Sequence, residues 1–279
     1  MDEKDLPVPR NSRPGESFAP EKSQKLMFEP AAEFVELPSH GYLYKGITDD
    51  EDVVKKGGVR IRPMTVNEEK ILATTRLVKS GQALDMVFQN CIKSRIDPGK
   101  MLSSDRVFLM LWLRAISYGN IYKFQMTCTN PACSKRFEYS VDLSQHPIKE
   151  MKEGVQEPIE VELPKSKYHV FFRLPRGIDE VEMVKISNQP KKMNDTDDTV
   201  VKRLRSTIIK ITDQDGKELP EEYFEPFIES LVAMDASTWR NKIESSDAGI
   251  EDITGIVCPH CETEFDSPIP ITENFFRAD

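Results

Sequence analysis

Apolar residues recur at helical spacing in three successive stretches of the first half of the chain. The first, about 66–79, opens on Thr65-Val-Asn-Glu68. There the hydroxyl and the carboxylate can each cover a free backbone amide of the first turn, as in a capping box. A second helix is predicted over about 82–94. The third stretch, DRVFLMLWLRAISYG, is apolar on most of its sides and therefore predicts the central helix of the core.

The remaining stretches alternate between strand and helix patterns. Apolar and polar residues alternate over 59–64 and on both sides of a hairpin-like segment at 120–144, and 157–177 predicts another hairpin. Helical spacing returns at 178–188 and at 197–211. Two further helical stretches and a strand-like GIV segment complete the pattern.

Composition narrows the class of protein. Of the 279 residues, 38% are hydrophobic and 30% are charged, with 19 prolines, which favours a partly solvated chain. The net charge of −9 argues against a general nucleic-acid binder, because such proteins neutralise phosphates with basic residues. No apolar run reaches the roughly 18 residues of a membrane span, and the first residues, MDEKDLPVPR, lack the apolar core of a secretory signal. The sequence therefore indicates a cytosolic protein.

Four of the five cysteines form two tight pairs, Cys128 with Cys133 in CTNPAC and Cys258 with Cys261 in CPHC. Each pair follows a strand-like approach and precedes a return segment that contains an aromatic residue, as in the knuckles of a zinc ribbon. Two such knuckles supply four soft thiolate ligands in tetrahedral geometry, at about 2.3 Å from the ion. The spacing predicts a structural Zn²⁺ site that is closed to substrates, because every coordination position is filled.

Other interpretations of the cysteines stay open on the sequence alone. Disulfides are disfavoured in a reducing cytosol. A thioredoxin-type centre would need CPHC at a helix N-terminus, whereas a strand-like return with prolines follows it. Iron in the same geometry, or hairpins without metal, would fit the same pattern. Cys91 lies on an apolar helical face and is predicted to be a core thiol, and His260 is predicted to be a solvent-facing spacer.

No catalytic signature accompanies the cysteines. The sequence contains no nucleophile elbow, phosphate-binding glycine loop or HExxH. TDQDG begins like a calcium loop, but Phe224 takes the place of the bidentate glutamate, so a tight turn is predicted. Ser39 beside His40 indicates a turn and not a nucleophile–base pair. We therefore expect a non-enzymatic protein with no small-molecule substrate.

The large aromatic residues suggest further contacts. Trp112 is expected in the core, and Trp239 is expected to anchor a short helix. For Phe275-Phe276 two roles are open: docking onto the zinc module, or insertion into the surface of a partner. Docking is favoured, because an exposed aromatic pair is costly.

These expectations combine into an α+β fold, in which helical bundle segments gather around a discontinuous zinc-ribbon-like β module with short N-terminal strands. Six segments follow along the chain: a disordered or partner-bound N-terminal arm (1–30), a strand and turn segment (31–64), a helical block (65–120), the first cysteine knuckle with β-hairpins (121–177), a helical insertion (178–248), and the second knuckle with a C-terminal tail (249–279).

The order of motifs resembles a known family. An LPS-x-G-x-x-Y segment (37–44) precedes R-P-M-T-x-x-E-E (62–69), and a helical block, a first knuckle, more helices, a CxxC knuckle and a closing Phe-Phe follow. This order is similar to the baseplate hub and hub-assembly proteins of T-even-like contractile-tailed bacteriophages, of gene 26 type, over about residues 33–279.

The resemblance implies a non-enzymatic structural or assembly component of a tail baseplate hub. It implies contacts with other hub and wedge proteins. Copies of the chain itself are a further candidate partner. The implied locations are the host cytoplasm during assembly and the tail baseplate of the virion. In the family's motif, Pro38, Ser39 and Gly41 are expected to form a surface turn, with no catalytic role for Ser39.

A second hypothesis is a zinc-ribbon adaptor that contacts nucleic acid or transcription machinery. It predicts basic residues around the knuckles. Only Lys135 and Arg136 supply them, while Glu262, Glu264 and Asp266 surround the second pair. The charge distribution therefore favours the first hypothesis.

Overall fold

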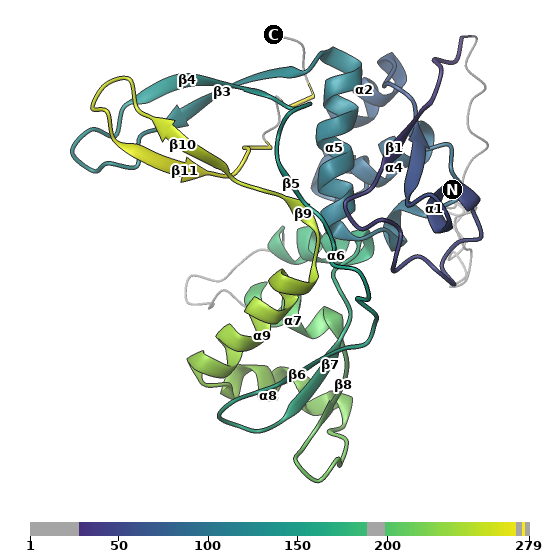
Figure 1. Ribbon diagram of the computed structural model, residues 1–279, viewed down its shortest axis with the longest axis vertical. Helices are drawn as coiled ribbons and strands as arrows, with labels where there is room; N and C mark the ends of the chain where they lie inside the picture. The colour runs from purple at the N-terminus through teal and green to yellow at the C-terminus, as the bar shows by residue number, and fades with distance from the viewer. Residues whose placement is uncertain (1–27, 189–198, 272–274, 277–279) are drawn as a thin grey trace, which may run out of the picture.

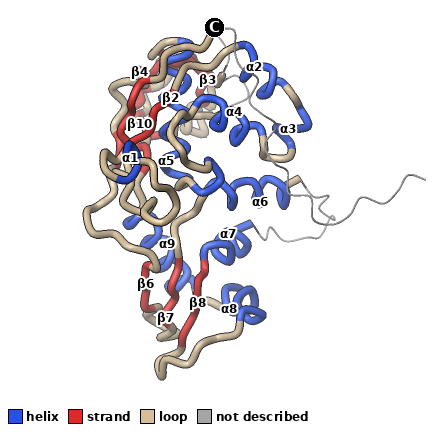
Figure 2. The backbone as a smooth tube through the Cα atoms, turned by 90° about the vertical axis from the view of Figure 1, so that its right-hand side faces the viewer, coloured by secondary structure: helices blue, strands red, loops and turns tan. Residues whose placement is uncertain are grey.

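The computed structural model describes residues 28–188, 199–271, 275 and 276. In this part of the chain, a helical body carries a protruding pair of β-hairpins on one side and a smaller α/β lobe below (Figure 1). The view turned by 90° shows the lobe as a separate layer under the body (Figure 2). Most of the N-terminal arm predicted over 1–30 lies outside the described residues.

The body packs two short antiparallel strands and several helices around one long helix. Its elements are β1 (Glu33–Glu36), α1 (Glu51–Val54), β2 (Gly58–Ile61), α2 (Val66–Ala73), α3 (Thr75–Lys79), α4 (Ala83–Cys91), the 3-10 helix η1 (Pro98–Lys100) and α5 (Ser103–Tyr118). β1 and β2 pair with Val35 opposite Val59, and both side chains face the core.

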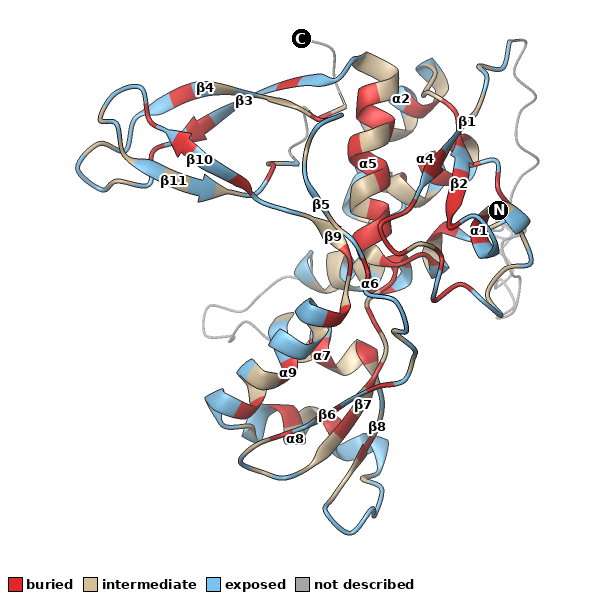
Figure 3. Cartoon of the chain, in the orientation of Figure 1, coloured by how far each residue is buried: buried red, intermediate tan, exposed pale blue. Residues whose placement is uncertain are grey.

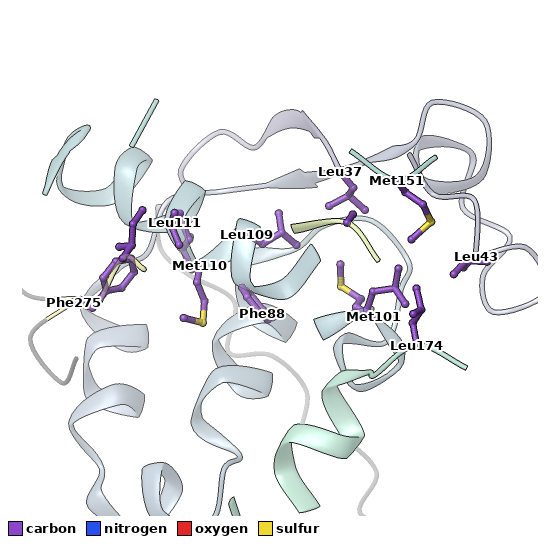
Figure 4. Close-up of a cluster of buried hydrophobic side chains, with 14 of the residues drawn as sticks. Leu37, Leu43, Phe88, Met101, Leu109, Met110, Leu111, Met151, Leu174 and Phe275 are labelled. Atoms are coloured by element: carbon purple, nitrogen blue, oxygen red, sulfur yellow. The ribbon is translucent and has the colours of Figure 1, made fainter. Parts of the chain in front are cut away.

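The long helix α5 is the centre of the core, as its sequence predicted. Leu109 and Leu113 are fully buried, and Figure 4 shows Leu109, Met110 and Leu111 among the buried side chains. Trp112, expected in the core, is only half-buried, and its Nε1 donates to Glu33 Oε1 at 3.0 Å.

The protruding part is a double hairpin made from two remote stretches of the chain. It consists of β3 (Ile121–Thr127) with β4 (Arg136–Asp142), and β10 (Ile253–Val257) with β11 (Glu264–Ser267). The short strands β5 (Ile148–Lys149) and β9 (Gly249–Ile250) pair at its base, where both chain segments pass into the rest of the molecule.

The lobe contains a three-stranded antiparallel sheet in the order β6-β7-β8. Its elements are β6 (Ile159–Glu162), β7 (His169–Phe172), α6 (Gly177–Ser187) at the junction with the body, α7 (Thr199–Thr207), β8 (Ile208–Thr212), the 3-10 helix η2 (Glu221–Tyr223), α8 (Phe224–Ser230) and α9 (Ala233–Ser246). Trp239 is fully buried and packs on Phe172, with 6.3 Å between ring centroids, so it anchors α9 as predicted.

The mixed helix and strand class is confirmed, but the helices do not gather around the double hairpin. The two hairpins extend away from the body, and their outward residues are mostly exposed (Figures 1 and 3). Their inner faces pack on each other, so no helix is needed to bury them.

Two predicted helix boundaries are wrong. The helix expected over 66–79 breaks at Thr74, whose ψ of 97° is extended, giving α2 and α3. The helix expected over 197–211 ends at Thr207, and the next five residues form β8. These residues include three isoleucines, and β-branched side chains favour a strand where a neighbouring strand is available to pair.

The motif R-P-M-T-x-x-E-E contains a buried ion pair. The predicted capping box is present, with Thr65 N and Oγ1 each donating to Glu68 Oε2 at 2.8 Å. Arg62 adds a charged partner that the sequence did not indicate, and its Nη2 donates to Glu68 Oε1 at 3.1 Å. The Arg62 and Thr65 hydrogen bonds outweigh the burial of Glu68 and lower the pKa of its carboxyl to about 2.

The turn formed by Pro38, Ser39 and Gly41 is buried, so the surface turn expected there is wrong. Asp105 of α5 accepts hydrogen bonds from Ser39 N at 3.1 Å, from Ser39 Oγ at 2.5 Å and from Tyr44 OH at 2.6 Å. The Ser39 hydroxyl is therefore committed to holding the turn on α5.

The buried Asp105 makes stability depend on pH. Burial raises the pKa of its carboxyl from 3.8 to about 6. Because the folded-state pKa is raised, the contribution of Asp105 is fully present below about pH 4 and is lost as the pH rises through about 6. We expect the difference in unfolding free energy between the native chain and Asp105→Asn to change by about 1 kcal/mol from pH 5 to pH 8. Urea unfolding at both pH values measures it, and a difference that does not change with pH would contradict the buried acid.

Candidate metal centre

The four paired cysteines meet at the tip of the double hairpin. Cys128 follows β3 and Cys258 follows β10, and each second cysteine lies on the turn beyond. All four Sγ atoms lie within 4.8 Å of one another. The distance is 3.6 Å from Cys128 Sγ to Cys261 Sγ and 4.0 Å from Cys133 Sγ to Cys258 Sγ.

These distances fit a four-thiolate metal site and exclude the alternative of disulfides in this structure. A tetrahedron with metal–sulfur bonds of about 2.3 Å separates its sulfur atoms by about 3.8 Å. A disulfide would bring two sulfurs to about 2 Å, and all four thiols are free. The residues present therefore have the type, number and spacing that a closed Zn²⁺ site requires.

The two knuckles share a backbone geometry although their spacing differs. Cys128 N donates to the Lys135 carbonyl and Cys258 N to the Thr263 carbonyl, both at 3.0 Å. The residue after the second cysteine has a left-handed conformation in each knuckle, with φ of 45° at Ser134 and 58° at Glu262. The longer gap in CTNPAC thus forms the same kind of turn as CPHC.

The left-handed residue at Glu262 allows a direct stability test. Side chains with a Cβ are strained at this φ, whereas glycine is not. We expect Glu262→Gly to raise the unfolding free energy by about 1 kcal/mol. The matched control is Glu264→Gly, which removes the same charge from strand β11 and should lower the stability. Thermal unfolding of both variants distinguishes them, and equal shifts of the same sign would contradict the knuckle geometry.

The surroundings shift the pKa values of two of the thiols in opposite directions. The Thr263 hydroxyl lies 3.2 Å from Cys261 Sγ and lowers the pKa of that thiol to about 6. Burial raises the pKa of Cys128 to about 12. Asn130 Nδ2 donates to Thr263 Oγ1 at 3.0 Å and so ties one knuckle to the other. A cation bound here would itself favour the thiolate form of Cys128.

An apolar layer lies beneath the cysteines and joins the two hairpins. Phe137 of β4 and Phe265 of β11 meet edge to face, with 6.4 Å between ring centroids. Phe124 and Met126 of β3 and Ile256 of β10 are buried on the same inner side. The double hairpin thus has a small core of its own, and the cysteines close its outer end.

The other candidate residues lie where the sequence placed them. Cys91 is fully buried in α4, and burial raises the pKa of its thiol to about 12, which suits an inert core thiol. His260 is exposed and is not among the clustered ligands. TDQDG is a tight turn, in which Asp213 Oδ1 accepts from the backbone N–H of Asp215 and Lys217.

Comparison with known proteins places this architecture in a family. The family described as T4 bacteriophage base plate protein matches residues 46–277, which include both knuckles and most of the body and lobe. The chain belongs to this family. The base plate family match takes in R-P-M-T-x-x-E-E but begins after the LPS-x-G-x-x-Y segment at 37–44. No curated protein and no solved structure matches the chain.

Proposed function

We propose that the chain is a non-enzymatic structural or assembly component of the tail baseplate hub, and that it acts through protein–protein contacts. The base plate family match over residues 46–277 carries this proposal. The resemblance of the motif order to hub and hub-assembly proteins supports the finer assignment to the hub. Among the described residues, no helix has the length and apolar character that a membrane crossing needs.

In this proposal a Zn²⁺ ion held by Cys128, Cys133, Cys258 and Cys261 gives the contact surfaces fixed positions. The ion links a hairpin that follows α5 to a hairpin that follows the lobe. Because the two hairpins come from remote parts of the chain, the ion closes a loop that contains β5 to β9. The double hairpin then projects as one rigid element toward its partners.

The proposed partners are other hub and wedge proteins and further copies of the chain. The proposed locations are the host cytoplasm during assembly and the virion baseplate afterwards. Cross-linking mass spectrometry on tagged chain from infected cells tests both. We expect cross-links to other baseplate proteins, in finished tails for a structural component or only in assembly intermediates for an assembly factor. A chain that separates from both fractions would contradict the proposal.

The alternative hypothesis, a zinc-ribbon adaptor, predicts that the purified chain binds nucleic acid. Saturable binding of duplex DNA in a low-salt mobility-shift assay would favour the adaptor. The side chains around the knuckles argue against it, because Glu262, Glu264 and Asp266 are exposed around the second pair. We therefore expect no saturable shift.

A further inference from the structure

The four clustered cysteines are not equally buried. Cys128 and Cys258, which come first in their knuckles, are buried, whereas Cys133 and Cys261 on the turns are half-buried. The two turns lie side by side at the outer end of the double hairpin (Figure 1). The sulfurs of Cys133 and Cys261 are therefore the ones that water and competing ligands reach first.

Polar side chains flank only one of these two outer sulfurs. The Thr263 hydroxyl lies 3.2 Å from Cys261 Sγ, and Asn130 Nδ2 lies 4.0 Å from the same atom. Apart from the cysteines themselves, these are the only side chains of the described residues within hydrogen-bond distance of a cluster sulfur. Cys261 thus combines partial exposure with a polar shell that its counterpart Cys133 lacks.

The two polar side chains act in series. Asn130 Nδ2 donates to Thr263 Oγ1 at 3.0 Å. A threonine hydroxyl has one proton, so a Thr263 oxygen that accepts from Asn130 keeps its proton for the Cys261 thiolate. Consecutive hydrogen bonds of this kind polarise and strengthen one another. The chain from amide to hydroxyl to sulfur crosses from the first knuckle to the second.

Both ends of this hydrogen-bond chain are anchored in backbone turns. Asn130 Oδ1 accepts from Ala132 N at 2.9 Å, and the Asn130 carbonyl accepts from Cys133 N at 2.9 Å. In the second knuckle, the Thr263 carbonyl accepts from Cys258 N at 3.0 Å. The turns that carry the cysteines therefore also aim the Asn130 amide and the Thr263 hydroxyl at the Cys261 sulfur.

We propose that Asn130 and Thr263 are positioning residues for the metal. Through the Thr263 hydroxyl they hold the Cys261 sulfur in its ligand position, and so they set how tightly the ion is bound and how slowly it is released. The inference rests on the proposed metal site and deepens it. Groups that hydrogen-bond a metal ligand fix its orientation, and their loss typically lowers metal affinity by about 10–100-fold.

The zinc affinity of full-length variants tests the inference. In competition with a chromophoric chelator, Thr263→Val should bind Zn²⁺ about 10–100-fold more weakly than the native chain and release it faster. Thr263→Ser restores the hydroxyl and should recover most of the native affinity. The matched control is Ser134→Ala, which removes a knuckle hydroxyl that donates to the Pro131 carbonyl at 3.2 Å and not to a sulfur. This control should bind zinc as the native chain does.

A spectroscopic measurement separates positioning from a general loss of stability. Co²⁺ bound by four thiolates gives a sulfur-to-metal charge-transfer band, and the energy of this band falls when a sulfur loses a hydrogen bond. Asn130→Asp still accepts from Ala132 N but cannot donate to Thr263, whose hydroxyl then turns to the new carboxylate. Thr263→Val and Asn130→Asp should therefore both shift the band to longer wavelength, whereas Thr263→Ser and Ser134→Ala should not.

The outcomes distinguish this inference from the proposed metal site. A native chain that binds no metal would overturn both. A native chain that binds Zn²⁺, with Thr263→Val and Asn130→Asp matching it in affinity and in the Co²⁺ band, would overturn the positioning role alone. If Thr263→Val does not fold, Asn130→Asp decides the outcome by the same two measurements.

Discussion

Replacing Cys258 with serine is expected to remove the bound zinc and to release the double hairpin. Folding and metal binding are coupled at structural four-thiolate sites, where the ion contributes on the order of 10 kcal/mol in small domains. The two hairpins then keep only their small aromatic core. We expect limited proteolysis to cut the variant within 121–142 and 253–267, and its thermal unfolding to begin at a lower temperature.

The control for this experiment is Cys91→Ser, which removes a buried thiol far from the cluster. It should cost some stability through the buried hydroxyl but leave the zinc content unchanged. If Cys258→Ser keeps its metal and its protease resistance, the four cysteines do not form one site.

Replacing Arg62 with alanine is expected to be the most destabilising change in the body. It would leave Glu68 buried without a cation, and breaking one side of a buried pair costs about 3–5 kcal/mol. The double variant Arg62→Met with Glu68→Leu should recover most of this loss, because it removes both charges together. Urea unfolding at neutral pH measures both, and a loss under about 1 kcal/mol for Arg62→Ala would contradict the buried pair.

The Arg62–Glu68 ion pair makes the free energy of unfolding depend on pH with the opposite sign to the dependence caused by Asp105. The pKa of Glu68 is lowered from 4.5 to about 2, so its stabilising contribution is present above about pH 4.5 and is lost as the pH falls through about 2. Arg62→Ala should reduce this dependence, because only the Thr65 hydrogen bonds would still lower the pKa of Glu68, and acid unfolding curves of the two proteins should approach each other at low pH.

Much of the candidate site could be predicted from the sequence because metal ligands obey short-range rules. The residue type and the spacing of Cys258 and Cys261 indicate a knuckle, and the strand patterns on either side place it on a hairpin. The capping box at Thr65 is likewise a local pattern, and so is the apolar periodicity of α5. These features depend on neighbours within a few residues.

The features that sequence analysis missed depend on residues far apart in the chain. Ser39 was expected in a surface turn. Its hydrogen-bond acceptor, Asp105, lies 66 residues further along the chain, and nothing near Ser39 in the sequence indicates this contact. The sequence pattern assigned Arg62 to a strand. It did not indicate that α2 places the Glu68 carboxylate within hydrogen-bond distance of the Arg62 guanidinium. Ile208 continued a helical period, but pairing with β7 made the strand the better structure.

The placement of the cysteine module was also set by tertiary structure. Alternating residues of β3 and β4 indicated two faces but not what would cover the inner one. The second hairpin, with Phe265 against Phe137, covers it, and this leaves the double hairpin free of the helices that the sequence analysis placed around it. The outward residues of this projecting element are mostly exposed (Figure 3).

The metal content of the purified chain tests the central claim most directly. The claim is that sulfurs from two remote hairpins hold one ion and so fix the double hairpin as a rigid element. Native mass spectrometry combined with elemental analysis, on protein purified without added metal or chelator, should find about one zinc ion per chain. Folded protein with no bound metal and four free thiols accessible to alkylation would contradict it.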